Sequence, residues 1–357
     1  MSAALLAFLG FAALIILHEL GHFTAAKAVG MRVERFALFF PPLLGRVKRG
    51  ETEYAIGAIP LGGYVKITGM NPAEEIPPEV AHRAYYRQPV WKRIVVIGAG
   101  PAVNIVLAFL ILWVLVWSNG VAEPTARVDT VSAPPALGVL APGDRIVSVD
   151  GVRGDFTTLR NQIGTHRCAG RQVDGCVAAT PATIVLELRG ERRTVELKPV
   201  YSASEDRMLI GFSPTAVQRA VGPGEAATRS LDEMWFFTSR TVSTIAQLFK
   251  PEVRDELSGV VGSYEVTRQT ILDDVGRVVL VLAVISLSLA IVNLFPFLPL
   301  DGGHIFWAVA EKVRGRAIPF GVMERAGFVG FVLVIALFMI GFTNDIGRLT
   351  GEGFGVR

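Results

Sequence analysis

The chain has 357 residues, of which 51% are hydrophobic, and its mean hydropathy is +0.45. These values exclude an ordinary soluble globular protein. The formal net charge of +3 is small, and we expect no nucleic-acid partner from it.

Four apolar segments are long enough to cross a bilayer, which takes about 17–25 residues. They span approximately residues 3–26, 94–117, 278–300 and 326–343. The first is not expected to be a cleaved signal peptide, because its basic residues Lys27, Arg32 and Arg35 follow it instead of preceding it. The pattern predicts a polytopic α-helical membrane protein with about four transmembrane helices.

The first apolar segment contains His18-Glu19-Leu20-Gly21-His22. Residues four apart on a helix lie about 40° apart, so the two histidines share one face. Two imidazoles in this arrangement bind zinc, and the glutamate beside them acts as a general base toward water. The alternative is a pair of core histidines. A metal site is favoured, because ionisable groups in hydrocarbon are costly unless they are paired or metal-bound.

Basic residues indicate the orientation in the membrane. Eleven lie between Lys27 and Arg93, and four lie between Lys312 and Arg325. The positive-inside rule places both loops in the cytosol, and therefore both termini and the long segment 118–277 outside.

Residues 53–67 in the first loop predict a glycine-broken β-hairpin. Two interpretations remain open, an exposed strand edge that captures an extended substrate backbone or a surface hairpin of no special role. The second span opens with small residues at Gly98–Ala102 that allow close helix approach. Asn104 then needs a polar partner, and we expect it to serve packing more than catalysis.

The outer region begins with a predicted module of short strands at residues 124–200. A Pro142-Gly143-Asp144 turn and a strand ending at an Asp-Gly pair resemble the bacterial PDZ pattern, in which a peptide adds as a strand. Residues 201–277 predict amphipathic helices that lie against the outer membrane surface or the helix bundle.

The only two cysteines, Cys168 and Cys176, lie in this outer module. A disulfide is favoured, because disulfides persist in an oxidising compartment and the intervening glycines let the ends approach. Two free thiols remain the alternative.

The third span ends in Asn293-Leu-Phe-Pro-Phe-Leu-Pro-Leu-Asp301-Gly302-Gly303-His304. The prolines interrupt the helix, and irregular backbone at membrane depth is tolerated when it is buried or lines a cavity. Asp301 is a suitable third ligand for a zinc site with two histidines. Counting residues from the outer surface places both motifs in the cytosolic half of the membrane. The alternatives are that Asp301 only caps the following helix, or that His304 is the ligand.

The resemblance rests on four features: the His18–His22 motif, the stretch from Asn293 to Gly303, the Gly-Pro-Ala-Val-Asn sequence of the second span and the single PDZ-like module. Together they resemble the site-2 protease family of intramembrane zinc metalloproteases. The bacterial regulator-of-sigma-E protease type is closest, and the resemblance covers nearly the whole chain. It implies that His18, His22 and Asp301 bind Zn²⁺ and that Glu19 is the catalytic base. It also implies that Asn293 holds the substrate backbone or the developing oxyanion. The strand that would pair with an unwound substrate contains Gly62, Gly63, Tyr64 and Val65.

The resemblance further implies a multi-pass protein of the bacterial inner membrane that cleaves single-span membrane proteins, such as anti-sigma factors or signal-peptide remnants. The expected domains are 1–117, 124–200, 201–277 and 278–357, with the PDZ-like insertion extracytoplasmic. Two rivals are a cation transporter and an inactive peptide-binding scaffold. The second and fourth spans have almost no polar residues for transport, and a scaffold would not need Glu19.

Overall fold

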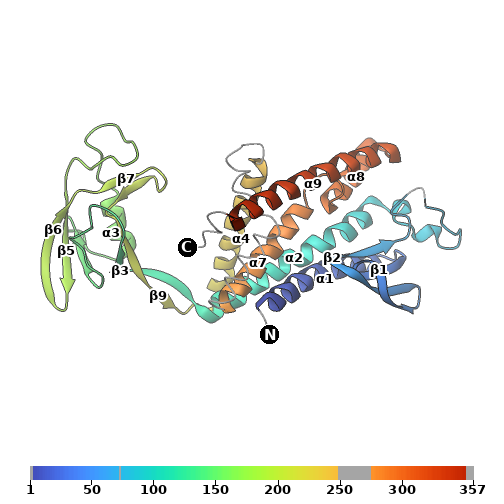
Figure 1. Ribbon diagram of the computed structural model, residues 1–357, viewed down its shortest axis with the longest axis horizontal. Helices are drawn as coiled ribbons and strands as arrows, with labels where there is room; N and C mark the ends of the chain where they lie inside the picture. Colours follow the sequence, from blue (N-terminus) through green and yellow to red (C-terminus); the bar gives the residue numbers. More distant parts are fainter. Residues whose placement is uncertain (1–2, 72–73, 248–274, 351–357) are drawn as a thin grey trace. The chain divides into compact units, whose positions relative to one another are not determined.

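The computed structural model describes residues 3–71, 74–247 and 275–350, which fall into two compact units (Figure 1). One unit contains Met1–Trp117 and Gly222–Arg357, and the other contains Ser118–Val221. The second unit is therefore inserted into the sequence of the first.

The first unit is mainly helical. Its elements in chain order are α1 (Ala3–Ala28), β1 (Val33–Arg49), β2 (Thr52–Ile67), η1 (Ala81–Arg83), η2 (Tyr85–Arg87), α2 (Val90–Asn119), α4 (Pro223–Ala246), α7 (Val275–Asn293), α8 (Asp301–Arg314) and α9 (Phe320–Thr350). Within the described ranges, three helical segments are long and apolar enough to cross a membrane: Phe8–Ala28, Val90–Asn119 and Gly321–Arg348. They correspond to the first, second and fourth predicted spans, and the protein is a membrane protein with a β-rich insertion.

The third predicted span, residues 278–300, is not a continuous helix. The apolar part of α7 is Val278–Asn293, which rises about 24 Å and falls short of a hydrocarbon core of about 30 Å. The helix ends there because Pro296 has no amide hydrogen to continue the ladder and disfavours helical backbone at the residue before it. A turn follows, and α8 begins at Asp301. The total of four transmembrane helices thus stays a prediction.

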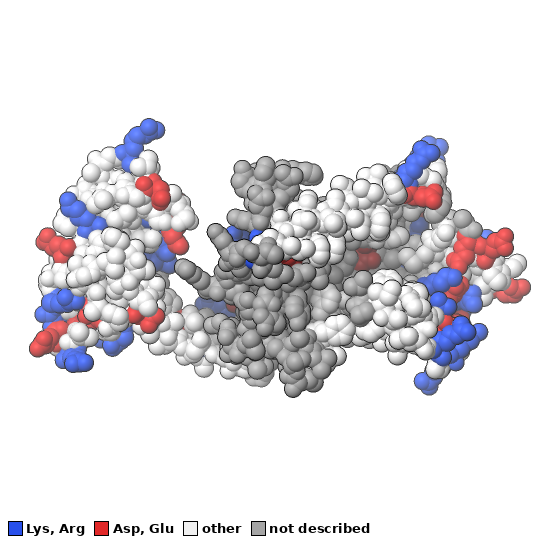
Figure 2. Space-filling model, in the orientation of Figure 1, with Lys and Arg blue, Asp and Glu red and all other residues white. Residues whose placement is uncertain are grey.

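Charged side chains are unevenly distributed over the helical unit. Figure 2 shows Lys, Arg, Asp and Glu gathered at the end that carries β1 and β2, whereas the visible surface of α9 is largely uncharged. Large apolar side chains such as Phe328 and Phe331 are exposed on α9. A helix that exposes apolar residues along its length is suited to a lipid environment.

The strands β1 and β2 form an irregular antiparallel pair with its turn at Gly50. The first half of β1 is bordered by Gly63–Ile67 on one side and by Glu53–Ile56 on the other. The hairpin predicted within 53–67 is therefore wrong, because those residues form one bent strand whose partners lie in 33–49. The apolar residues near the start of β1 supply the half-buried surface that β2 pairs with.

A small core fixes this sheet to the helices. Its buried members come from α1, β1, β2, η2, α2 and the turn after α1; they are Ala26, Met31, Val33, Ile67, Tyr85, Val96 and Ile97. The helices α1 and α2 also approach closely, because a side chain at Gly21 would overlap the backbone of Ala99. This contact agrees with the small residues predicted to allow close helix approach.

The helix α4 agrees with the predicted amphipathic segment. Its Met234 packs with Ala108 and Leu112 of α2 and with Ala283 and Leu287 of α7. The rest of the predicted helical segment, residues 248–274, lies outside the described residues. Residues 201–219 differ from the prediction, since they contain strands.

The second unit is built on one antiparallel sheet with the strand order β6-β5-β4-β3-β9. Its elements are β3 (Val121–Val131), β4 (Arg145–Val149), α3 (Phe156–Ile163), β5 (Ala182–Leu188), β6 (Glu191–Leu197), β7 (Val200–Ser202), β8 (Arg207–Leu209) and β9 (Phe212–Arg219). The predicted strand before the Asp150-Gly151 turn is present as β4. The unit is longer than the predicted 124–200, because β9 pairs with β3 and forms one edge strand of the sheet.

Cys168 and Cys176 are bonded to each other, with a Cα–Cα distance of 5.8 Å. The predicted disulfide is therefore present. Both half-cystines pack against the core of the unit that contains Leu159, Ile184 and Leu186.

Candidate active site

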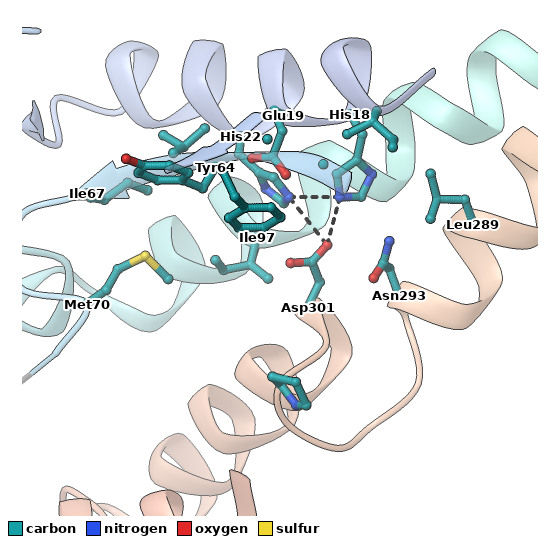
Figure 3. Close-up of a pocket in the computed structure, with 16 residues that line it drawn as sticks. His18, Glu19, His22, Tyr64, Ile67, Met70, Ile97, Leu289, Asn293 and Asp301 are labelled. Atoms are coloured by element: carbon teal, nitrogen blue, oxygen red, sulfur yellow. Dashed lines mark hydrogen bonds and ion pairs between the residues drawn. The ribbon is translucent and has the colours of Figure 1, made fainter. Parts of the chain in front are cut away.

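The side chains of His18, His22 and Asp301 converge at one point of the helical unit (Figure 3). Both histidines are buried, and their Nε2 atoms lie 3.2 Å apart. The Oδ2 atom of Asp301 lies 3.2 Å from Nε2 of His18 and 3.3 Å from Nε2 of His22. Three potential ligand atoms, two from α1 and one from α8, therefore face one another.

The spacing of these atoms fits a zinc ion. Ligands about 2.0–2.1 Å from a tetrahedral zinc lie about 3.3 Å from one another. The Oδ2 atom of Asp301 is also buried and has no hydrogen bond of good geometry among the described residues. A buried carboxylate oxygen without such a bond is costly, and a metal would satisfy it. The two imidazoles and one carboxylate form a typical catalytic zinc donor set.

The helix α2 contacts both histidines. The Nδ1 atom of His22 donates to the backbone carbonyl of Val96 at 2.9 Å, which leaves the Nε2 lone pair for a metal. Pro101 lies inside α2 and has no amide hydrogen for the carbonyl of Ile97, the residue after Val96. Gly100 lies against both rings, and a Cβ atom there would overlap His22 and lie 2.9 Å from Nε2 of His18.

Asp301 is the first residue of α8, and its side chain turns toward the histidines. A side chain at Gly302 or Gly303 would overlap the backbone of Leu294 and Phe297, so the start of α8 lies directly on the preceding turn. The alternative ligand His304 is not part of the three-residue cluster. The far end of α8 is fixed to α2 by two hydrogen bonds of 2.8 and 2.9 Å between Arg93 and Glu311.

Glu19 points into the same space as the two imidazoles (Figure 3). The segment Gly62–Val65 of β2 passes beside it and lines the same cavity. A Cβ atom at Gly63 would lie 3.0 Å from Cγ of Glu19, so glycine permits this close approach. Among the described pairings this segment has β1 as its one strand partner, and all four of its residues line the site.

These residues line a cavity of about 390 Å³ that also includes Asn293, the last residue of α7. Tyr64 is held by a 3.2 Å hydrogen bond from Arg35 and stacks on Phe40. Apolar side chains lie beyond the polar centre on either side, with Met70 and Ile97 on one and Leu289 on the other (Figure 3). The structure thus brings together all nine residues that the sequence indicated as candidates.

Sequence reasoning missed three contributions to this site. The carbonyl of Val96 gives no signal in sequence, because every residue has one. The Arg93–Glu311 pair joins residues 218 positions apart. Gly100 was visible as a small residue, yet its contact with the histidines depends on the register between α1 and α2.

Together, the membrane helices and the two histidines and aspartate beside a glutamate are the arrangement expected of a metalloprotease built into a membrane protein. The chain belongs to peptidase family M50, whose model matches residues 6–337. This match confirms the resemblance to the site-2 protease family.

Individual relatives agree with this assignment. A Rhizobium meliloti protein provisionally named a zinc metalloprotease is 30% identical over 365 residues, which cover 95% of this chain and 94% of the relative. Another with the same kind of name, from Clostridium perfringens, is 31% identical over 346 residues, covering 95% and 97%. The Mycobacterium tuberculosis protein named zinc metalloprotease Rip1 is 29% identical over 393 residues, covering 93% and 94%.

Proposed function

We propose that this protein is an intramembrane zinc metalloendopeptidase that cleaves the transmembrane segments of single-span membrane proteins. The observation that carries the proposal is the convergence of His18, His22 and Asp301 beside Glu19, at the edge of a β-strand. Anti-sigma factors and signal-peptide remnants are the expected substrate types, and the protein lies in the bacterial inner membrane.

The three ligands would be His18, His22 and Asp301. A bound zinc supplies a Lewis acid that polarises the scissile carbonyl and makes water more acidic. Glu19 accepts the proton of the attacking water and then delivers it to the leaving amine nitrogen. The amide of Asn293 hydrogen-bonds the substrate backbone or the developing oxyanion.

The free edge of Gly62–Val65 supports binding of an extended substrate. The backbone hydrogen bonds of a helix shield its carbonyls, so the substrate has to unwind before cleavage. Strand addition at this edge replaces the lost backbone hydrogen bonds and places the chain beside Glu19.

Charge supports the orientation. The Lys and Arg residues of the β1–β2 region and of the α8–α9 loop face the cytosol under the positive-inside rule. Both termini and the second unit then lie outside the cytosol. The second unit is a PDZ-like module that admits substrates already shortened by another protease.

The proposal is tested with purified protein and a tagged single-span substrate. Glu19→Gln should lower cleavage about 10²–10⁴-fold while zinc remains bound, since Glu19 is a base and not a ligand. Asp301→Ala should lose both zinc and activity, whereas the matched variant His304→Ala should keep its zinc. Undiminished turnover by Glu19→Gln would refute the mechanism, and normal zinc content in Asp301→Ala would remove that residue from the site.

A further inference from the structure

The second ring nitrogen of His18 faces a side chain with no role in the proposed mechanism. The Nδ1 atom of His18 lies 3.3 Å from the amide nitrogen of Asn104. Asn104 is fully buried in α2, and its Oδ1 atom has no hydrogen-bond partner among the described residues. A buried amide in contact with a ligand ring is more than a packing residue.

The direction of this hydrogen bond decides whether His18 can bind a metal. If the amide nitrogen donates to Nδ1, the ring proton is on Nε2 and blocks the atom that faces Asp301. Rotation of the amide by 180° places the oxygen against the ring, and Nδ1 then donates to it. Only this second orientation leaves a lone pair on Nε2 of a neutral imidazole.

The two histidines thereby receive equivalent support from α2. His22 donates from Nδ1 to the carbonyl of Val96. With the amide of Asn104 rotated, Nδ1 of His18 would donate in the same way to the side-chain oxygen of Asn104, two turns further along α2. Ser286 of α7 donates to the backbone carbonyl of Asn104 at 2.9 Å, a hydrogen bond that does not involve the side-chain amide. The partner of His22 is thus a backbone carbonyl, and the partner of His18 is a side chain.

We propose that Asn104 is a positioning residue for the metal site, whose side-chain oxygen accepts the Nδ1 proton of His18 and so directs Nε2 toward the metal. The inference rests on the proposed zinc site. Partners of this kind fix the ring orientation of a ligand, and their loss typically weakens metal affinity about 10–100-fold.

Zinc affinity of the full-length protein in detergent, measured by competition with a chelator and without substrate, tests the proposal. Asn104→Leu should weaken the zinc dissociation constant about 10–100-fold. Asn104→Asp should bind zinc nearly as well as the wild type, because a carboxylate oxygen still accepts from Nδ1. The matched control Ser286→Ala removes a buried hydrogen bond to the backbone of the same residue and should leave the affinity unchanged.

Thermal unfolding of the metal-free proteins separates positioning from folding, and all variants should unfold near the wild-type temperature. Wild-type affinity in Asn104→Leu, or an equal loss in Asn104→Asp or Ser286→Ala, would overturn the inference. A wild-type protein that takes up no zinc would instead refute the proposed function.

Discussion

Gly100 determines how closely α2 can approach the rings of His18 and His22. A Cβ atom at this position would lie 2.6 Å from Cε1 of His22 and 2.9 Å from Nε2 of His18. Both distances are below van der Waals contact, and the neighbouring α1 is packed against Ala99, so neither side can easily move.

We therefore expect Gly100→Ala to displace the imidazoles and to lower zinc affinity at least about tenfold, in keeping with other losses of ligand support. Gly98→Ala is the matched control on the same helix, since its Cβ would meet only Cδ1 of Ile305 at 4.0 Å. Zinc titration of both variants checks this expectation. Equal zinc affinity in the two variants would show that the rings tolerate the added methyl group.

At the residue scale, sequence predicts the candidate ligands better than it predicts the residues that support them. His18, Glu19 and His22 follow from helical spacing, and Asp301 follows from ligand chemistry and depth in the membrane. Asn104 was recognised as a buried polar residue, but its partner lies 86 residues away on another helix. That contact depends on the register between two packed helices, which apolar patterns do not fix.

Ion pairs hold the β1–β2 region to the end of α1. Arg83 donates to the carbonyls of Gly30 and Met31 just after α1, and Lys92 donates to that of Val29. Glu51, next to the turn between the strands, accepts hydrogen bonds from Arg83 and Lys27. These contacts fix the sheet whose edge borders the active site.

The hydrogen bonds from Arg83 and Lys27 lower the pKa of Glu51 from 4.5 to about 2. The stabilisation is therefore complete above pH 4.5 and is lost as the pH falls through about 2. Because the pair is partly exposed, we expect Glu51→Gln to weaken the sheet by about 1 kcal/mol at neutral pH. Hydrogen exchange of the β1 and β2 amides should show this difference shrinking between pH 5 and pH 2, following the pKa shift.

Glu79→Gln is the control for this prediction, because Glu79 is exposed and has no ion pair among the described residues. It should leave the exchange rates unchanged throughout the same pH range. A Glu51→Gln effect that did not vary with pH would point to packing instead of charge.

At the element scale, long apolar helices were predictable and irregular segments were not. The spans at α1, α2 and α9 follow from hydropathy alone. The pairing of β2 was misassigned, because its partner β1 begins about 20 residues earlier. The strand β2 also bends, so that its Gly63 and its Ile56 both pair with Leu38 of β1. The end of α7 at Asn293 agrees with the prolines that follow it, although hydropathy extends to Leu300.

At the scale of the whole molecule, the second unit is an insertion whose two ends are adjacent. Val121 at the start of β3 pairs with Arg219 at the end of β9. Paired residues of antiparallel strands lie about 5 Å apart, so the chain enters and leaves the unit at nearly the same place. The unit also has its own buried core and its own disulfide. The Pro-Gly-Asp signature predicted a module here, but its last strand, β9, has no comparable motif.

Replacing residues 120–220 by a linker of about four glycine and serine residues should therefore leave the zinc site intact, because the linker only has to span adjacent strand ends. Zinc content should match the full-length protein, and shortened substrates should still be cleaved. If the second unit is a filter, the deletion variant should also cleave single-span substrates with large folded outer domains, which the full-length protein rejects. Substrates with outer domains of graded size, assayed side by side with both proteins, measure this. An unchanged preference for shortened substrates would rule out the filter, and a loss of zinc would show that the two units depend on each other.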